Sequence, residues 1–312
     1  MSRVGIAIPR TVWSASAEQF YTQVLHGLED ACMLAGHTVL SQVADTADQE
    51  LEVLEDWVRR GAVDLVVLKD LGTDDPRPAQ MRRLGLPFLV IGDVRQKEIG
   101  PGVLNDNSEA MTELLAALAG MGHRQVAHVS GPTSLVHTKW RREAYLAFVH
   151  EHGTAADSWV GDYSDESGAR ALEALLARDP APSAIVFDND VMAIAACERA
   201  RELGIDIPGQ LSIIAWDDTL AAQLHDPPLA VLAHVPHQTG FDAGVLATRL
   251  LSAASTTLAQ EERWIVHESP DLLVRGTVAS PRAPLPPRSA GIIDRRSALG
   301  APSAVPERIP AR

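Results

Sequence analysis

The sequence predicts an α/β fold of two Rossmann-like lobes, each built around a parallel sheet. Short apolar runs alternate with helical patterns along the chain, as in parallel strands that are covered by helices on both faces. The chain has 312 residues, which is more than one hydrophobic core usually accommodates. The alternation also begins again near the middle of the chain, so two similar lobes are expected.

The first half of the chain opens with an apolar strand over 4–9. Apolar residues then recur at helical spacing until Gly36, a residue type that commonly ends helices. The run over 64–69 is almost wholly apolar, as is typical of a strand buried on both faces. The remaining elements expected in this half are a strand over 38–43, a helix over 50–60, a helix over 78–84, a strand over 88–92 and a helix over 108–121.

The second half repeats the alternation and ends in a segment of different character. Its expected strands lie at 125–130, 159–161, 184–187, 211–216 and 230–235, with closing strands at 263–267 and 272–276. Its expected helices lie at 136–152, 165–177, 190–203 and 237–253. Residues 280–312 are rich in Pro and Arg and show no apolar periodicity, so a disordered tail is expected there.

Composition excludes several classes of function. The 27 Lys and Arg residues against 41 Asp and Glu give a formal charge of −14, which opposes binding to a phosphate backbone. Cys32 and Cys197 lie far apart and outside any metal-ligand spacing, so neither a disulfide nor a metal is expected. No signal peptide and no apolar run of membrane-spanning length is visible. These features predict a cytoplasmic protein without a cofactor or a membrane partner.

Several segments occur together in one order. They are VGIAIP at 4–9, Phe20-Tyr21, Gly122-His123-Arg124, Ser130-Gly131-Pro132, Arg141 with Tyr145, DNDVMA at 188–193, LSIIAWDD at 211–218 and DPPL at 226–229. Together they resemble the effector-binding core of the LacI/GalR family of bacterial transcription regulators. The resemblance covers about residues 3–279, and the last three segments at their spacing are the specific ones.

The resemblance implies a type I periplasmic-binding-protein-like fold with three crossovers and a small effector, most often a sugar, between the lobes. One lobe would comprise about 3–121 and 236–267, and the other about 122–235 and 268–279. Members of the family form homodimers and bind operator DNA through an N-terminal helix-turn-helix. This chain starts where that segment would end, so DNA binding is expected only through a domain absent from the sequence.

Ligands of open α/β sheets bind outside the carboxyl ends of the strands, where the first candidates fall. Asp217 follows the strand over 211–216, and its carboxylate could accept two hydrogen bonds from neighbouring sugar hydroxyls. The alternative role, stabilising a turn, is assigned to Asp218. Arg141 matches an effector-contacting arginine of the family. Arg142 and Lys139 on the same helix would then lie on a solvated face.

Three further candidates have competing structural roles. Asn189 ends a strand and could bind a ligand through its amide, although it or Asp190 could instead cap the next helix. Tyr163 matches a position where the family often places an aromatic ring, which can stack on the C–H face of a sugar. Phe20 could provide the opposite wall of the site, but its helical spacing also suits a core residue.

The last candidates are two histidines and one charged pair. His137 lies one turn before the candidate arginine, and a surface or capping role is an equal alternative. His234 occupies a crossover position that family members use for effector contacts, with a satisfied buried histidine as the alternative. Lys69 and Asp70 end a strand of the first lobe and could reach the ligand, although Asp70 also suits a turn.

These residues predict a sugar-sensing core of a LacI-type regulator, in which the ligand favours lobe closure. A solute-binding protein that delivers a sugar to a transporter is the alternative, and the missing export signal argues against it. An enzyme is not expected, because no nucleophile elbow, phosphate-binding loop, H-E-x-x-H or strand-linked G-x-G-x-x-G motif is found.

Overall fold

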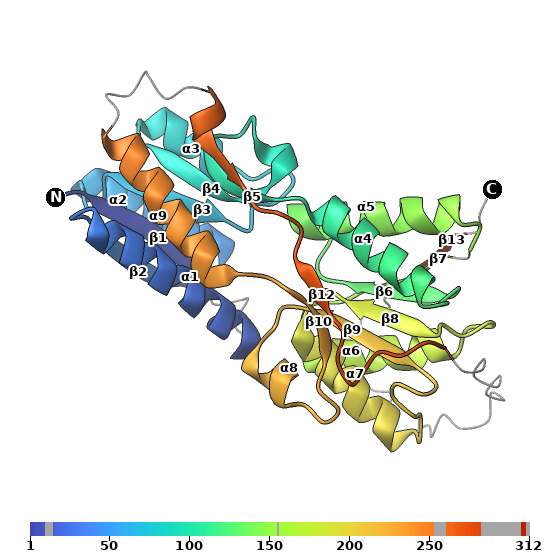
Figure 1. Ribbon diagram of the computed structural model, residues 1–312. Helices are drawn as coiled ribbons and strands as arrows, with labels where there is room; N and C mark the ends of the chain where they lie inside the picture. Colours follow the sequence, from blue (N-terminus) through green and yellow to red (C-terminus); the bar gives the residue numbers. More distant parts are fainter. Residues whose placement is uncertain (10–14, 155, 253–259, 282–306, 310–312) are drawn as a thin grey trace. The chain divides into compact units, whose positions relative to one another are not determined.

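The computed structural model describes residues 1–9, 15–154, 156–252, 260–281 and 307–309. The chain forms two compact α/β units, which confirms the predicted fold class (Figure 1). Unit 1 comprises Met1–Asn107, Ser134–His137 and Val235–Pro270, and unit 2 comprises Ser108–Thr133, Thr138–His234 and Asp271–Arg312. Each unit is therefore assembled from separated stretches of the chain.

Unit 1 is a six-stranded parallel sheet in the order β11-β5-β4-β3-β1-β2. Its strands are β1 (Arg3–Pro9), β2 (Thr38–Ala44), β3 (Leu65–Lys69), β4 (Phe88–Asp93), β5 (Gly102–Asn105) and β11 (Trp264–Val266). Its helices are α1 (Ala15–Leu34), α2 (Ala47–Arg60), α3 (Arg77–Leu84), α9 (Pro236–Ser252) and the 3₁₀ turns η2 (Val94–Gln96) and η3 (Gln260–Arg263). The short β5 was not predicted.

Successive side chains of the unit 1 strands pack on opposite faces of the sheet, as strand geometry requires. Leu65 and Val67 of β3 face the cluster that α1 and α9 cover, whereas Val66 and Leu68 face the cluster that α2 and α3 cover. All four side chains are fully buried. This two-sided burial explains the continuous apolar run in the sequence.

Helices α1 and α9 approach each other closely because glycines occupy their contact. A Cβ atom added at Gly240 would lie 1.9 Å from the carbonyl oxygen of Val24, and one added at Gly27 would lie 1.9 Å from that of His237. No side chain fits at either position without separating the helices. The contact joins two segments that lie about two hundred residues apart in the sequence.

Unit 2 is a seven-stranded sheet in the order β12-β10-β9-β8-β6-β7-β13, parallel except for its two edge strands. Its strands are β6 (Val126–Ser130), β7 (Ala156–Val160), β8 (Ala184–Phe187), β9 (Ser212–Trp216), β10 (Ala230–Ala233), β12 (Asp271–Leu273) and β13 (Glu307–Ile309). Its helices are α4 (Asn107–Gly120), α5 (Val136–Glu151), α6 (Asp165–Leu176), α7 (Asp190–Glu202) and α8 (Leu220–Leu224).

Besides β5 and the short α8, which were not predicted, two details differ from the sequence-based expectations. Helix α4 was expected in the first lobe, but Met111 and Leu115 pack in unit 2 with Val186 and Ile214 of its sheet. Residues 307–309 form β13, which pairs with β7, where a disordered tail was expected. The rest of that tail beyond residue 281 lies outside the described residues.

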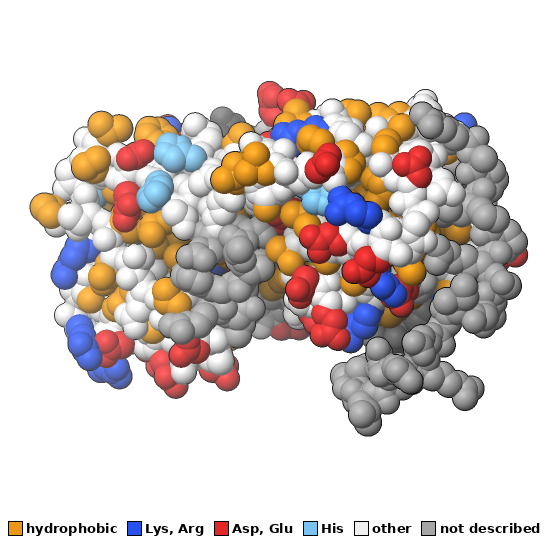
Figure 2. Space-filling model, turned by 90° about the horizontal axis from the view of Figure 1, so that it is seen from below, with side chains coloured by type: hydrophobic (Ala, Val, Ile, Leu, Met, Phe, Trp, Pro, Cys, Tyr) orange, Lys and Arg blue, Asp and Glu red, His pale blue; other side chains and the backbone are white. Residues whose placement is uncertain are grey.

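The described surface is mixed in charge. On the face drawn in Figure 2, acidic side chains are scattered among basic ones. Among the described helices, none is long and apolar enough to cross a lipid bilayer.

The close contact between α1 and α9 makes Gly240→Ala destabilising. The added methyl group must displace the Val24 carbonyl, so we expect the free energy of unfolding to fall by about 1–3 kcal/mol. Urea unfolding followed by circular dichroism measures the change. Gly120→Ala is the matched control, because a Cβ atom there meets nothing within 4 Å. Equal stability of the two variants would contradict the proposed role of the glycine contact.

Candidate functional site

The predicted site residues form two groups, one in each unit, near the carboxyl ends of parallel strands. Unit 2 holds Asp217, Arg141, Asn189, Tyr163 and His234, and unit 1 holds Lys69, Asp70, Phe20 and His137. Three of these residues are also the three described non-glycine residues with a left-handed backbone: Asp70, Tyr163 and Asp217, with φ of 48°, 70° and 77°. Strained backbone of this kind is concentrated at functional sites.

The buried carboxylate of Asp188 organises the unit 2 group. It follows the last residue of β8 and accepts hydrogen bonds from His128 Nε2 and from the Gly131 amide, both at 3.0 Å. Its Oδ1 lies 3.8 Å from Arg141 Nη1. Burial alone would raise the pKa of Asp188, but His128, Arg141 and the Gly131 amide together lower that pKa below its ordinary value.

Arg141 is held between this carboxylate and an aromatic ring. Its guanidinium carbon lies 4.0 Å from the ring centroid of Trp216, the last residue of β9, and its Nη1 donates to the Asp188 carbonyl at 3.4 Å. The His234 ring lies 5.9 Å from the Trp216 ring. Arg141, Trp216 and His234 therefore pack in one contiguous set, in which the Arg141 guanidinium is buried between the Asp188 carboxylate and the Trp216 ring.

Asp217 follows Trp216 and remains partly exposed. Burial raises its pKa to about 7, with Arg141 opposing the shift and Asp190 and Asp188 adding to it. Asp218 instead forms a bidentate ion pair with Arg275, at 2.6 and 2.8 Å. The two neighbouring aspartates thus have different surroundings, and Asp218 has a structural partner.

Asn189 fulfils the capping role that was its alternative. Its Oδ1 accepts from the Met192 amide at 3.0 Å as the N-cap of α7, while its Nδ2 donates to the Tyr163 carbonyl at 3.1 Å. The Tyr163 hydroxyl lies 3.1 Å from the Thr138 hydroxyl. A Cβ atom at Gly131 would lie 2.1 Å from the Tyr163 ring, so this glycine admits the ring.

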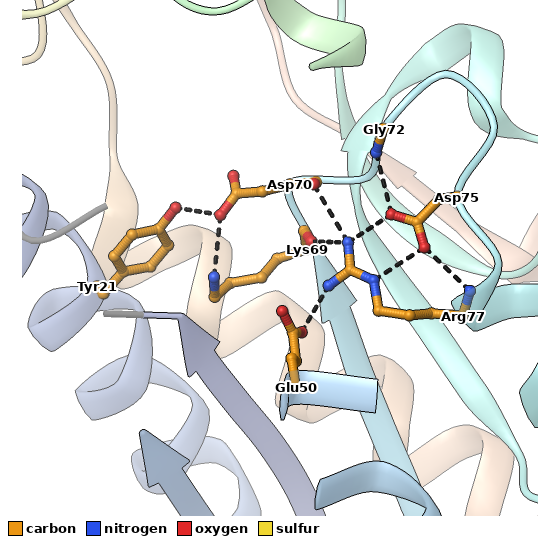
Figure 3. Close-up of polar contacts among 7 residues, drawn as sticks. All are labelled: Tyr21, Glu50, Lys69, Asp70, Gly72, Asp75 and Arg77. Carbon is orange, nitrogen blue, oxygen red and sulfur yellow. Dashed lines mark hydrogen bonds and ion pairs between the residues drawn. The ribbon is translucent and has the colours of Figure 1, made fainter. Parts of the chain in front are cut away.

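In unit 1 the predicted pair Lys69 and Asp70 meets a tyrosine that was not predicted (Figure 3). Lys69 Nζ lies 2.9 Å from Asp70 Oδ2 and 4.0 Å from the ring centroid of Tyr21, whose hydroxyl donates to the same Asp70 oxygen. Burial would raise the pKa of Asp70, but Lys69, His137 and Tyr21 hold it well below its ordinary range. Phe20 packs against the core and touches the Tyr21 ring edge, as its alternative role implied.

Arg77 supports the backbone of this pair, as Figure 3 shows. Its Nη2 donates to the carbonyls of Lys69 at 3.0 Å and Asp70 at 3.2 Å. The same guanidinium binds Asp75 at 2.6 Å and the buried Glu50 at 2.5 Å. Arg77 thus links a strained strand end to two carboxylates, and burial raises the pKa of Glu50 despite this partner.

Sequence reasoning missed Asp188, Trp216, Tyr21 and Arg77. The first three stand beside predicted residues within the quoted segments. Asp188 lies directly after a strand and Trp216 ends one, so strand-end position could have found these two, whereas Tyr21 lies within α1. Within the described ranges, no group of three His, Cys, Asp or Glu side chains could hold a metal ion.

We expect Arg77→Met to destabilise unit 1 by about 3–5 kcal/mol, because Glu50 would remain buried without its partner. Chemical denaturation measures the loss. Arg59→Met is the control, since Arg59 pairs with Asp56 on an exposed surface and contributes little. The double variant Arg77→Met with Glu50→Gln should regain part of the stability, and its failure to do so would contradict an unpaired charge as the cause.

The raised pKa of Asp217 makes stability depend on pH. Between the ordinary value of 3.8 and about 7, the folded chain holds a proton that the unfolded chain has released, so this group lowers stability as pH rises through that window. The change in the free energy of unfolding that Asp217→Asn causes should therefore be more stabilising at pH 8 than at pH 4, by about 1–3 kcal/mol. Thermal unfolding at both pH values tests this, with the exposed Asp206→Asn as control. An equal effect at both pH values would contradict it.

Comparison with known proteins identifies the family. The chain matches a family model described as a periplasmic binding protein-like domain over residues 115–278. Catabolite control protein A of Priestia megaterium is 28% identical over 255 residues, which are 80% of this chain and 74% of that protein. An HTH-type transcriptional regulator in the aml 5′ region of Streptomyces limosus is 30% identical over 266 residues, 81% of this chain and 73% of that protein.

Solved structures show the same fold. A LacI family transcriptional regulator from Bifidobacterium animalis subsp. lactis is 28% identical, with a TM-score of 0.79 over 90% of this chain and 98% of that one. The complex of the transcriptional regulator CelR with cellobiose has a TM-score of 0.78 at 24% identity, over 89% of this chain and 84% of that one. The chain therefore belongs to the periplasmic binding protein-like family, among the LacI-type transcriptional regulators.

Proposed function

We propose that this chain is the effector-sensing core of a LacI-type transcriptional regulator and that its effector is a sugar. The observation that carries the proposal is the left-handed backbone of Asp217, Tyr163 and Asp70. These strained residues lie near the carboxyl ends of strands, where ligands of this architecture bind. Polar contacts hold two of these residues: Asp70 contacts Lys69 and Tyr21, and Tyr163 contacts Thr138 and Asn189.

The unit 2 group has the chemistry of sugar recognition. The carboxylate of Asp217 accepts from hydroxyl groups, and the guanidinium of Arg141 donates to them. The partly exposed ring of Tyr163 offers an apolar face for sugar C–H groups. The Trp216 indole N–H is buried and has no hydrogen-bond partner among the described residues, so it is a further donor. Because Asp188 already balances Arg141, an uncharged ligand suits the group.

The unit 1 group supplies the second half of the proposed mechanism. Asp70 and Tyr21 present a carboxylate and a hydroxyl, and we propose that they contact the same effector. A ligand that contacts both units shifts the protein toward the arrangement of the units that it binds more tightly. The size of the shift is set by the difference between its binding free energies for the two arrangements. The CelR–cellobiose complex, a structure of similar fold, supports a sugar as the ligand class.

We further propose a cytoplasmic, non-enzymatic homodimer. Several relatives are named HTH-type transcriptional repressors or regulators, which supports action on operator DNA through a helix-turn-helix. The same names do not favour the alternative of a solute-binding protein that serves a transporter.

A thermal-shift screen across sugars and polyols, followed by calorimetry with the best ligand, tests the proposal. Asp217→Ala should weaken binding by about 1–3 kcal/mol, because ligand hydroxyls would be left without an acceptor. Asp70→Asn should weaken it as well if both units contact the ligand. Asp206→Ala, an exposed aspartate of unit 2, should leave the affinity unchanged. Unchanged affinity in Asp217→Ala would remove this residue from the site, and turnover of the sugar would show an enzyme.

A further inference from the structure

Unit 1 contains a pocket at the edge of its sheet opposite the predicted site. The pocket has a volume of about 810 Å³ and lies where β4, β5 and β11 begin, whereas Asp70 lies beyond the carboxyl end of β3. Because these strands are parallel, their amino ends meet at one edge and their carboxyl ends at the other. The volume falls within the roughly 300–1,000 Å³ that is usual for small-molecule sites.

Two aromatic side chains form walls of the pocket and are fixed in place. The Trp264 indole Nε1 donates to the Gly100 carbonyl at 3.0 Å. The ring of Phe88 lies so close to Gly100 that an added Cβ atom there would come within 2.9 Å of it. The walls are therefore held before any ligand arrives, which lowers the entropic cost of binding.

The lining of the pocket is cationic. Arg82, Lys97 and Arg263 line it, against the single carboxylate of Glu98. Arg82 donates to the Ile99 carbonyl and lies 5.4 Å from the Phe88 ring centroid, and Arg263 lies 5.9 Å from the Trp264 ring centroid. Within the part of the chain that the structure describes, none of the three cations forms an ion pair with a carboxylate.

This local charge contrasts with the whole chain, whose formal charge is −14. In an acidic protein most cations find carboxylate partners at the surface, as Arg59, Arg170 and Arg199 do here. Three cations beside two aromatic walls instead favour a ligand that brings its own negative charge and a flat apolar body. A phosphate or carboxylate would face the cations, and an aromatic group would lie against Phe88 and Trp264.

We propose that this pocket is a second ligand site, which binds a small aromatic carboxylate or aromatic phosphate. The site is separate from the sugar-binding groups and does not depend on them. It gives the core a place to receive a second chemical signal, distinct in charge from the uncharged effector.

Calorimetry on the full chain with 1-naphthyl phosphate, 2-naphthoate and the neutral 2-naphthamide tests the site. At least one of the two anions should bind, and the comparison of their affinities shows whether the site prefers a phosphate or a carboxylate. The amide and inorganic phosphate alone should bind at least about tenfold more weakly, because each lacks one of the two recognised features. Equal affinity of the amide, equal affinity of inorganic phosphate, or no binding of either anion at millimolar concentration would overturn the proposal.

Charge-reversal variants locate the binding. Lys97→Glu with Arg263→Glu should weaken anion binding about tenfold or more, whereas Arg59→Glu with Arg170→Glu, a matched change at exposed cations elsewhere, should not. Trp264→Phe should remove the change in tryptophan fluorescence that the ligand causes, while thermal unfolding shows that the variant is folded. Equal weakening by both charge pairs would reveal nonspecific attraction and overturn a defined site. Sugar affinity, measured in parallel, separates this result from the fate of the proposed function.

Discussion

The set of contacts made by the buried carboxylate of Asp188 is the interaction on which the predicted site residues of unit 2 depend. An ionised carboxylate without contacts would be costly in this interior, and three contacts offset that cost: His128, the Gly131 amide and Arg141. The same contacts bring the strand ends of β6 and β8 and helix α5 to one point. Arg141 is thereby placed over Trp216, and the Gly131 turn leaves room for the Tyr163 ring.

Unit 1 reaches a comparable result with opposite charges. There a buried guanidinium, Arg77, binds the carbonyls of Lys69 and Asp70 and is balanced by Glu50 and Asp75. In unit 1 the buried charge binds the backbone of the left-handed Asp70 directly, whereas in unit 2 it binds the Gly131 amide, and Gly131 packs against the ring of the left-handed Tyr163. Left-handed conformations of non-glycine residues persist only where surrounding contacts hold them, and the buried charges supply such contacts.

The sequence predicts most of the fold because the spacing of apolar residues along the chain directly reflects which side chains are buried. The wholly buried strands β3, β8 and β9 appear as continuous apolar runs, whereas the four-residue β5 follows Gly100 and Pro101 and reads as a loop. Which lobe an element joins is harder to predict than the element itself, as helix α4 shows. Its apolar stripe predicts a buried face but does not indicate which sheet covers that face. Similarly, strand-end position predicts Asp217 and Asp70, while the role of Asp188 depends on partners from three separate segments.

The glycine contact between α1 and α9 limits when unit 1 can fold during synthesis of the chain. The first helix emerges from the ribosome with its contact face uncovered, and the helix that covers it follows only after nearly all of unit 2 has been synthesised. Strands β12 and β13, the two edge strands of unit 2, follow later still. Neither unit can therefore be completed from a contiguous half of the gene, and splitting the coding sequence at its midpoint would separate partners that each fold requires.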